Sequence, residues 1–187
     1  VAAMAQVPDL LFDLVLDDQD HSADWLRRGE VSATVCARDK PIVGCDMHDL
    51  GSLRYIATAS PDFIKRWFAG GVSAKAINQA PMLTFNAKDT LQQMWLDTHI
   101  GPKLSPPSHF LPSSQAFVDA ARAGMGWGMI PVAQVRGHIK QGRLVPLQPN
   151  SEITVPLSWQ VNRIMAPALQ PVTQAVVKAA AKVLQRA

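Results

Sequence analysis

An acidic cluster is the polar feature of this sequence with the clearest capacity for chemistry. Asp17, Asp18 and Asp20 place three carboxylates within four residues, and His21 follows them directly. Carboxylates this close repel one another unless something neutralises them. An organic cation held by charge-assisted hydrogen bonds would do so, and so would a metal ion bound by carboxylate and imidazole ligands. The cluster is equally typical of a solvated loop in which Asp20 or Ser22 caps the following helix, so three interpretations stay open.

A second polar feature is the pair Ser113-Ser114, which we expect between a short strand and a helix. Backbone N–H groups at the beginning of a helix favour anions, so this position could hold the carboxylate of a ligand. Capping of the helix by a serine hydroxyl is the simpler alternative.

The remaining motifs give little support to catalysis or to a bound cofactor. The sequence has no GxSxG or HExxH motif, and its five histidines are dispersed. Cys36 and Cys45 have no CxxC spacing, which argues against a structural zinc site or a disulfide and fits a reducing cytoplasm. Cys36 has no assignable base, so we expect it in the core. The glycines of residues 124–128 follow a helix, whereas a dinucleotide loop follows a strand. We therefore expect no catalytic residue and no cofactor. For the acidic cluster, a metal ion is the least favoured of the three interpretations, and we expect none.

Composition narrows the class of protein further. Of the 187 residues, 48% are hydrophobic and 18% are charged, which is typical of a globular protein and excludes general disorder. No apolar run reaches the roughly 18 residues of a membrane span, and no basic residue precedes the first apolar stretch as it would in a signal peptide. The net charge is +3, yet residues 1–49 carry ten acidic and four basic residues. The basic residues are scattered, so we do not expect this segment to bind DNA directly.

Apolar runs and helix signals alternate along the chain, which predicts an α/β fold. The first strand, helix and second strand should form a parallel βαβ unit. We expect strands at 10–16, 31–36, 53–59, 82–85, 109–111, 127–130, 144–147 and 157–161. We expect helices at 23–28, 61–68, 73–79, 89–99, 114–123, 132–140 and 168–185.

This alternation also predicts two lobes. Residues 1–59 and 158–187 should build the first lobe, and residues 60–157 should form a second lobe inserted into it. A cleft between two such lobes is a usual place for a small ligand.

Several motifs together resemble a known family. They are LRRGEV at 26–31, LGSLRYIATASPDF at 50–63, APMLTFNAKDTLQQMW at 80–95, SSQAFVDAARAGMGWGMIP at 113–131 and GRLVPL at 142–147. The chain resembles the effector-binding domain of LysR-type transcriptional regulators, whose patterns LxxGELD and VxAGxGxxxLP correspond to residues 26–31 and 121–131. The RRGEV and SSQAFV runs and the acidic loop look most like the arginine- and lysine-responsive branch, of ArgP or LysG type.

This resemblance implies two Rossmann-like lobes with a ligand cleft, similar to type II periplasmic binding proteins. It implies a cytoplasmic, non-enzymatic sensor of lysine or arginine that controls genes of amino-acid transport or export as a dimer or tetramer. DNA would be bound by an N-terminal winged helix-turn-helix, which no residue of this chain matches. A solute-binding protein for a cationic amino acid is the alternative with the same fold.

The resemblance also implies positions for the effector contacts. In the family's pattern these fall on Asp18, Gln19, Asp20, Cys36, Phe85, Asn86, Ser113, Ser114, Met129 and Pro131. The family's domain opens with a strand and most of a helix before the point that matches Val1, and residues 1–7 resemble the end of that helix. The first lobe is therefore expected to lack its N-terminal strand.

Overall fold

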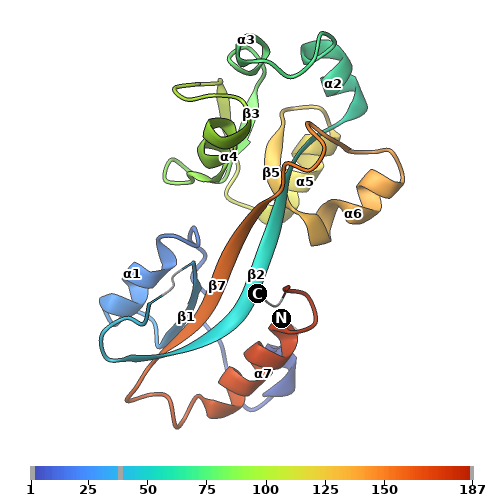
Figure 1. The fold of residues 1–187 in the computed structure, drawn as a ribbon. Coiled ribbons are helices and arrows are strands. Elements are labelled where there is room, and N and C mark those ends of the chain that lie inside the picture. The colour runs from blue at the N-terminus through green and yellow to red at the C-terminus, as the bar shows by residue number, and fades with distance from the viewer. Residues whose placement is uncertain (1–2, 38–39, 186–187) are drawn as a thin grey trace. The chain divides into compact units, whose positions relative to one another are not determined.

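The chain forms two compact units in the computed structural model, which describes residues 3–37 and 40–185 (Figure 1). The first unit combines Val1–Leu53 with Thr154–Ala187, and the second is Arg54–Ile153. The chain passes between the units within β2 (Cys45–Ala59) and at the beginning of β7 (Ile153–Asn162). Among the described residues the larger sheet has the order β1 (Ala33–Cys36), β7, β2 and β5 (Gly128–Pro131), and β6 (Val145–Pro146) also pairs with β2.

The first unit is built around the edge of this sheet. β1 pairs antiparallel with β7, with Ala33 opposite Val161. The helix α1 (Ser22–Arg27) ends where Gly29 takes a φ of +71°, a left-handed conformation that glycine adopts without strain. Ala23 and Leu26 of α1 pack with Cys36, Ile42 and Cys45 in the core of this unit. The unit also contains η1 (Met4–Gln6) and α7 (Gln170–Ala180).

The second unit contains the remaining helices and strands. β5 and β6 both pair antiparallel with β2, and β3 pairs in parallel with β4. Leu83, Phe117 and Ile130 belong to one hydrophobic core cluster of this unit, and Trp95 is also fully buried there. Its elements are α2 (Pro61–Trp67), α3 (Ala74–Ile77), β3 (Met82–Thr84), α4 (Leu91–His99), β4 (Ser108–Phe110), α5 (Ser114–Arg122), β5 (Gly128–Pro131), α6 (Val132–Lys140) and β6 (Val145–Pro146).

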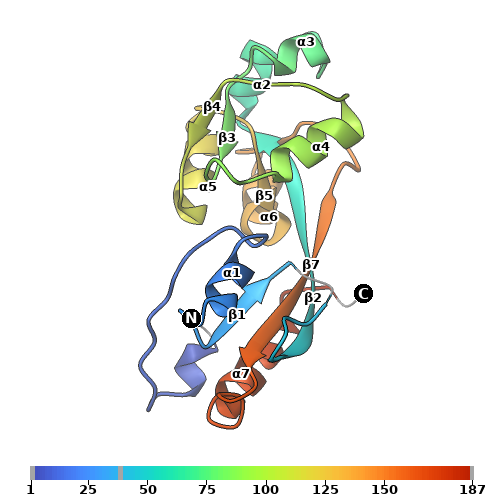
Figure 2. The same cartoon turned by 90° about the vertical axis from the view of Figure 1, so that its left-hand side faces the viewer.

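The expected strand at residues 10–16 is wrong. The segment is a coil between η1 and α1 (Figure 2), and the side chains of Leu11, Leu14 and Leu16 are 101%, 62% and 82% exposed. The expected parallel βαβ unit is therefore also absent from the described residues, where β1 pairs only with the antiparallel β7. An apolar run becomes a strand only where a neighbouring strand takes up its N–H and C=O groups, and in the described part of the chain no strand pairs with this one.

The two crossing strands and the last helix differ in length from the expectation. β2 begins at Cys45 rather than 53, because its first half continues the sheet although it carries the polar residues His48 and Asp49. β7 begins at Ile153, and α7 is confined to 170–180, with Pro171 in its first turn. Of the expected helix end at residues 1–7, Met4–Gln6 form a 3-10 turn, and residues 1–2 lie outside the described residues. No helix in the described part of the chain has the length and apolar character needed to cross a membrane.

Candidate functional site

The acidic loop before α1 is organised by its own carboxylates. Asp17 accepts hydrogen bonds from Trp25 Nε1 and from the N–H of Asp18, both at 2.8 Å. Asp18 Oδ1 accepts the N–H of Asp20 at 2.9 Å. Asp20 is exposed, and its carboxylate takes part in none of the hydrogen bonds or ion pairs found among the described residues. Asp17 therefore anchors the loop, and Asp20 presents its negative charge to solvent.

The metal interpretation of this loop finds no support in the structure. Within residues 3–37 and 40–185, no three His, Cys, Asp or Glu side chains gather so that they could hold a metal ion. Helix capping by the loop is also not observed, because His21 is the N-cap of α1 and makes no side-chain cap.

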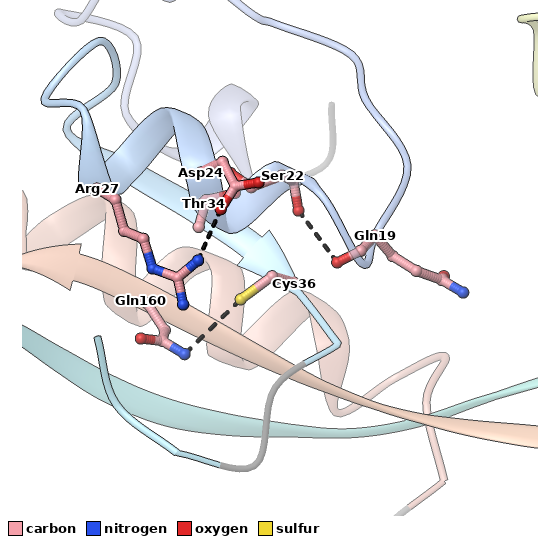
Figure 3. Close-up of polar contacts among 7 residues, drawn as sticks. All are labelled: Gln19, Ser22, Asp24, Arg27, Thr34, Cys36 and Gln160. Atoms are coloured by element: carbon pink, nitrogen blue, oxygen red, sulfur yellow. Dashed lines mark hydrogen bonds and ion pairs between the residues drawn. The ribbon is translucent and has the colours of Figure 1, made fainter. Parts of the chain in front are cut away.

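The loop is held at the carboxyl end of β1 by Gln19 and Ser22 (Figure 3). The carbonyl oxygen of Gln19 accepts the N–H of Ala37 at 3.0 Å, and the hydroxyl of Ser22 donates to the carbonyl of Val35 at 2.8 Å. The Gln19 side chain points away from β1 in this view. These contacts fix the backbone that carries Asp18 and Asp20.

Cys36 lies at the end of β1 inside a buried polar cluster. Its sulfur is 3.8 Å from Ser158 Oγ and 3.7 Å from Gln160 Nε2, and all three side chains are at most 1% exposed. Gln160 Oε1 accepts the N–H of Ile42 at 2.7 Å, and its Nε2 donates to the carbonyl of Lys40 at 3.2 Å. The cluster ties β1, β7 and the segment before β2 together.

Both thiols should resist alkylation in the folded protein. Burial raises the pKa of the Cys45 thiol, and Cys36 is fully buried. Because the thiolate is the reactive form, we expect iodoacetamide at neutral pH to label neither residue on the timescale that labels a free thiol. Mass spectrometry should count two labels only after unfolding in guanidinium. Rapid labelling of Cys36 in the native protein would show that the polar cluster opens readily.

In the second unit, the turn after β3 carries Phe85 and Asn86. The N–H of Phe85 donates to Asp89 at 3.0 Å, and the same carboxylate accepts the N–H of Leu91 at the start of α4, also at 3.0 Å. Asn86 Oδ1 accepts the N–H of Lys88 at 2.8 Å. The side chains of Asp89 and Asn86 thus stabilise this turn by accepting its backbone N–H groups.

Ser113 and Ser114 stand at the beginning of α5. Ser113 is the N-cap, and its hydroxyl accepts the N–H of Ala116 at 3.3 Å. Ser114 is the exposed first residue of the helix. The capping role is therefore real for Ser113. The first N–H groups of a helix have no hydrogen-bond partner within the helix. The N-terminus of α5 therefore also offers backbone N–H donors to an anion.

Met129 and Pro131 lie in β5 opposite β2. Met129 is buried and pairs with Ala57, whereas Pro131 is half-buried and pairs with Tyr55. Met129 is thus a core residue.

Two threonines near these positions were missed by sequence reasoning. Thr58 on β2 and Thr84 at the end of β3 are buried, and neither hydroxyl has a hydrogen-bond partner among the described residues. Buried hydroxyls are normally paired, so these two are candidates to bond a ligand or a water. The only sequence signal was a single threonine within each apolar run.

Comparison with known proteins places this geometry in a family. Residues 2–181 match the family described as the LysR substrate binding domain. The chain belongs to this LysR family. Its fold class is the mixed α/β architecture of LysR effector domains, which are similar to periplasmic binding proteins. The solute-binding-protein alternative loses its support, because the family match covers nearly the whole sequence.

Three relatives illustrate the position of the chain within the LysR family. The transcriptional regulator ArgP from Pseudomonas fluorescens is 42% identical over 150 residues, which are 80% of this chain and 50% of that protein. The structure of the C-terminal domains of a LysR family protein from Agrobacterium tumefaciens has 47% identity and a TM-score of 0.92, covering 100% of this chain and 93% of that one. Full-length LysG from Corynebacterium glutamicum with bound effector Arg has 30% identity and a TM-score of 0.87, covering 98% and 64%.

ArgP and LysG regulators are thus among the relatives that the chain resembles, as the sequence motifs indicated. It spans about half to three fifths of the length of the curated relatives that it matches.

Proposed function

We propose that this chain is the effector-sensing part of a LysR-type regulator of the ArgP/LysG branch, and that its effector is free arginine or lysine. The observation that carries the proposal is the likeness to LysG solved with bound effector Arg. A regulator of this kind would act in the cytoplasm on genes of amino-acid transport or export, as a dimer or tetramer that binds DNA through a separate N-terminal domain. Its role would be sensing rather than catalysis.

The side chains at the candidate positions suit a basic amino acid. In the first unit, Asp20 offers an exposed carboxylate, and Asp18 lies beside it in the same fixed loop. Carboxylates form strong charge-assisted hydrogen bonds with guanidinium and ammonium groups. In the second unit, the N–H groups at the beginning of α5, at Ser113 and Ser114, suit the α-carboxylate of the effector. We propose that the remaining predicted contacts shape the site: Gln19, Cys36, Phe85, Asn86, Met129 and Pro131.

Cys36 would take part through its position. Its thiol is occupied by Ser158 and Gln160, so its contribution is to fix the end of β1. The effector would act by population shift, binding one conformation of the regulator more tightly than another and so changing how the DNA-binding domains are presented.

Thermal unfolding with added amino acids tests the effector class. A ligand at 100 times its dissociation constant adds about 2.7 kcal/mol to the stability of the folded state, which raises Tm by about 5–10 °C for a chain of this size. We expect this rise with L-arginine or L-lysine and not with L-glutamate or L-leucine. A rise with L-leucine alone would contradict the proposal.

Two substitutions test the two ends of the effector separately. Asp20→Asn should weaken the binding of arginine or lysine by about tenfold or more, since a hydrogen bond to a charged group contributes about 1.5–3 kcal/mol. Asp9→Asn, at another exposed carboxylate of the same unit, is the matched control. Isothermal titration calorimetry measures both. If Asp20→Asn and Asp9→Asn bound arginine or lysine equally tightly, Asp20 would not contact the effector.

Ser114→Pro tests the carboxylate end without disturbing the helix. Proline is favoured at the first position of a helix, and it removes one N–H group there. Ser113 has extended backbone angles that tolerate a following proline. We expect Tm without ligand to stay unchanged and the affinity for arginine to fall. Agmatine, which lacks the carboxylate, should bind the variant and the parent protein equally. If Ser114→Pro bound arginine as tightly as the parent protein does, the N-terminus of α5 would not be part of the effector site.

A further inference from the structure

A cavity of about 530 Å³ lies in the first unit between the end of α1, the beginning of β2 and the end of β7. Its lining includes three arginines, Arg27, Arg28 and Arg163, and no aspartate or glutamate of the described residues. Val43 and Ile164 also line it, and their side chains are 100% and 88% exposed. The cavity therefore combines guanidinium groups with two apolar side chains that the rest of the unit leaves uncovered.

Arg163 is fixed at this cavity by two side-chain hydrogen bonds. Its Nε donates to Asp46 at 2.9 Å, and its Nη2 donates to the carbonyl of Cys45 at 3.2 Å. Its backbone N–H donates to the carbonyl of Gly44 at 2.9 Å, which holds the end of β7 against the segment that leads into β2. The other N–H groups of this guanidinium have no partner among the described residues, so they are available to a ligand.

Arg27 and Arg28 are oriented in a similar way by one ion pair each. Nη1 of Arg27 lies 2.6 Å from Asp24, and Nε of Arg28 lies 2.5 Å from Glu30. The Arg28 guanidinium also lies over the ring of Trp25, 5.0 Å from its centroid. The side chains of Asp24 and Glu30 are 46% and 45% exposed, and exposed ion pairs contribute little to stability. An anion in the cavity could therefore share these guanidinium groups at little cost.

We propose that this cavity binds a small organic anion with at least two negative charges, whose phosphate or carboxylate groups contact the arginines and whose apolar part packs on Val43 and Ile164. The planar guanidinium forms paired hydrogen bonds with the oxygens of both kinds of group. The volume lies within the range of about 300–1,000 Å³ that is usual for small-ligand sites. The same positive charges disfavour arginine or lysine as the occupant.

The cavity and the acidic loop lie at opposite ends of β1. Asn162, which lines the cavity, donates its backbone N–H to Ser32 just before β1, whereas Gln19 of the acidic loop accepts the N–H of Ala37 just after β1. The anion site therefore does not rest on the effector proposed above. The first unit would carry contacts for a cationic effector at one end of β1 and bind an anion at the other.

Isothermal titration calorimetry with four probes tests the chemistry of the ligand. ADP carries both negative charge and an apolar ring, citrate carries its charge on carboxylates, pyrophosphate carries charge alone and adenosine carries the ring alone. We expect ADP or citrate to bind, pyrophosphate to bind more weakly than ADP, and adenosine not to bind. Preference for ADP would identify phosphate as the anionic group, and preference for citrate would identify carboxylate. Failure of ADP, citrate and pyrophosphate to bind at millimolar concentration would overturn the proposal, and so would adenosine binding as tightly as ADP.

A substitution at Arg163 tests whether the anion lies in this cavity. Arg163→Gln should weaken the binding of the tighter probe by about tenfold or more, because it removes a charge-assisted contact. Arg136→Gln is the matched control, at an exposed arginine of α6 in the second unit, and it should bind the probe as the parent protein does. Equal weakening in both variants would show that only the overall positive charge attracts the anion, and would overturn the proposed site.

A second substitution tests the site without removing a hydrogen bond of the fold. Val43 is fully exposed, so Val43→Asp should leave Tm unchanged. The new carboxylate at the cavity should repel the anion and weaken its binding by about tenfold. Val183→Asp adds the same charge at another exposed apolar residue of the first unit and should leave the affinity unchanged. If Val43→Asp bound the probe as tightly as Val183→Asp does, the anion would not occupy this cavity.

Discussion

Replacing Trp95 with alanine will lower the free energy of unfolding of the second unit by about 3–5 kcal/mol. Trp95 is fully buried, its ring lies 5.4 Å from that of Trp127, and its Nε1 donates to the carbonyl of Ser151 at 2.8 Å. The substitution removes a large apolar surface, leaves a cavity and leaves that carbonyl without its donor. Thermal unfolding should show a Tm lower by about 6–20 °C.

Two further variants separate the contributions of Trp95. Trp95→Phe keeps most of the ring but removes the hydrogen bond to Ser151, so it should cost about 1–3 kcal/mol. Trp67→Ala is the control, because Trp67 is only half-buried and lies beside Phe63 and Arg66. Its cost should be clearly smaller. If both alanine variants lowered Tm equally, the burial of Trp95 would not be a major source of stability for the second unit.

Replacing Gln160 with leucine should destabilise the first unit by about 1–3 kcal/mol, although the volume of the side chain hardly changes. The amide of Gln160 is fully buried and is the acceptor for the N–H of Ile42. Leucine leaves this buried donor unsatisfied. Because Gln160 also contacts Cys36, the variant should react faster with iodoacetamide at that thiol. Urea unfolding and timed labelling measure the two effects.

A half-buried glutamine provides the control for Gln160. Gln93 lies on α4, and its side chain donates to Asp97 and to no other partner among the described residues, so Gln93→Leu should change stability by no more than about 0.5 kcal/mol. Should Gln160→Leu be as mild as Gln93→Leu, the buried polar cluster would be dispensable. The candidate effector position at the end of β1 would then have to be held by other contacts.

Local signals made much of the fold predictable. Ser60, Ser73 and Ser113 each cap a helix with the side-chain hydroxyl accepting an N–H three residues later. Such a cap involves only neighbouring residues, so its signal is complete within a short stretch of sequence. The end of α1 at Gly29 is local in the same way. The family motifs were equally readable, because they are contiguous runs of residues.

The strands were predictable only where apolar patterning and pairing agree. Residues 10–16 have the composition of a strand, yet they remain a coil because none of the strands in the described residues pairs with them. The first half of β2 has polar residues, yet it is a strand because the sheet continues there. A strand is completed by hydrogen bonds to a distant segment, so no window of sequence contains the whole of its stabilisation.

The sequence by itself determined the helix starts capped by Ser60 and Ser113, the end of α1, the acidic loop and the family. Only the tertiary structure decided which carboxylate of the loop is exposed: Asp17 accepts a hydrogen bond from Trp25, whereas Asp20 is exposed to solvent. It also showed Cys36 enclosed by Ser158 and Gln160, which follow it by more than a hundred residues. Residue types set what a side chain can do, but its exposure and its partners depend on contacts between segments that the linear order keeps apart.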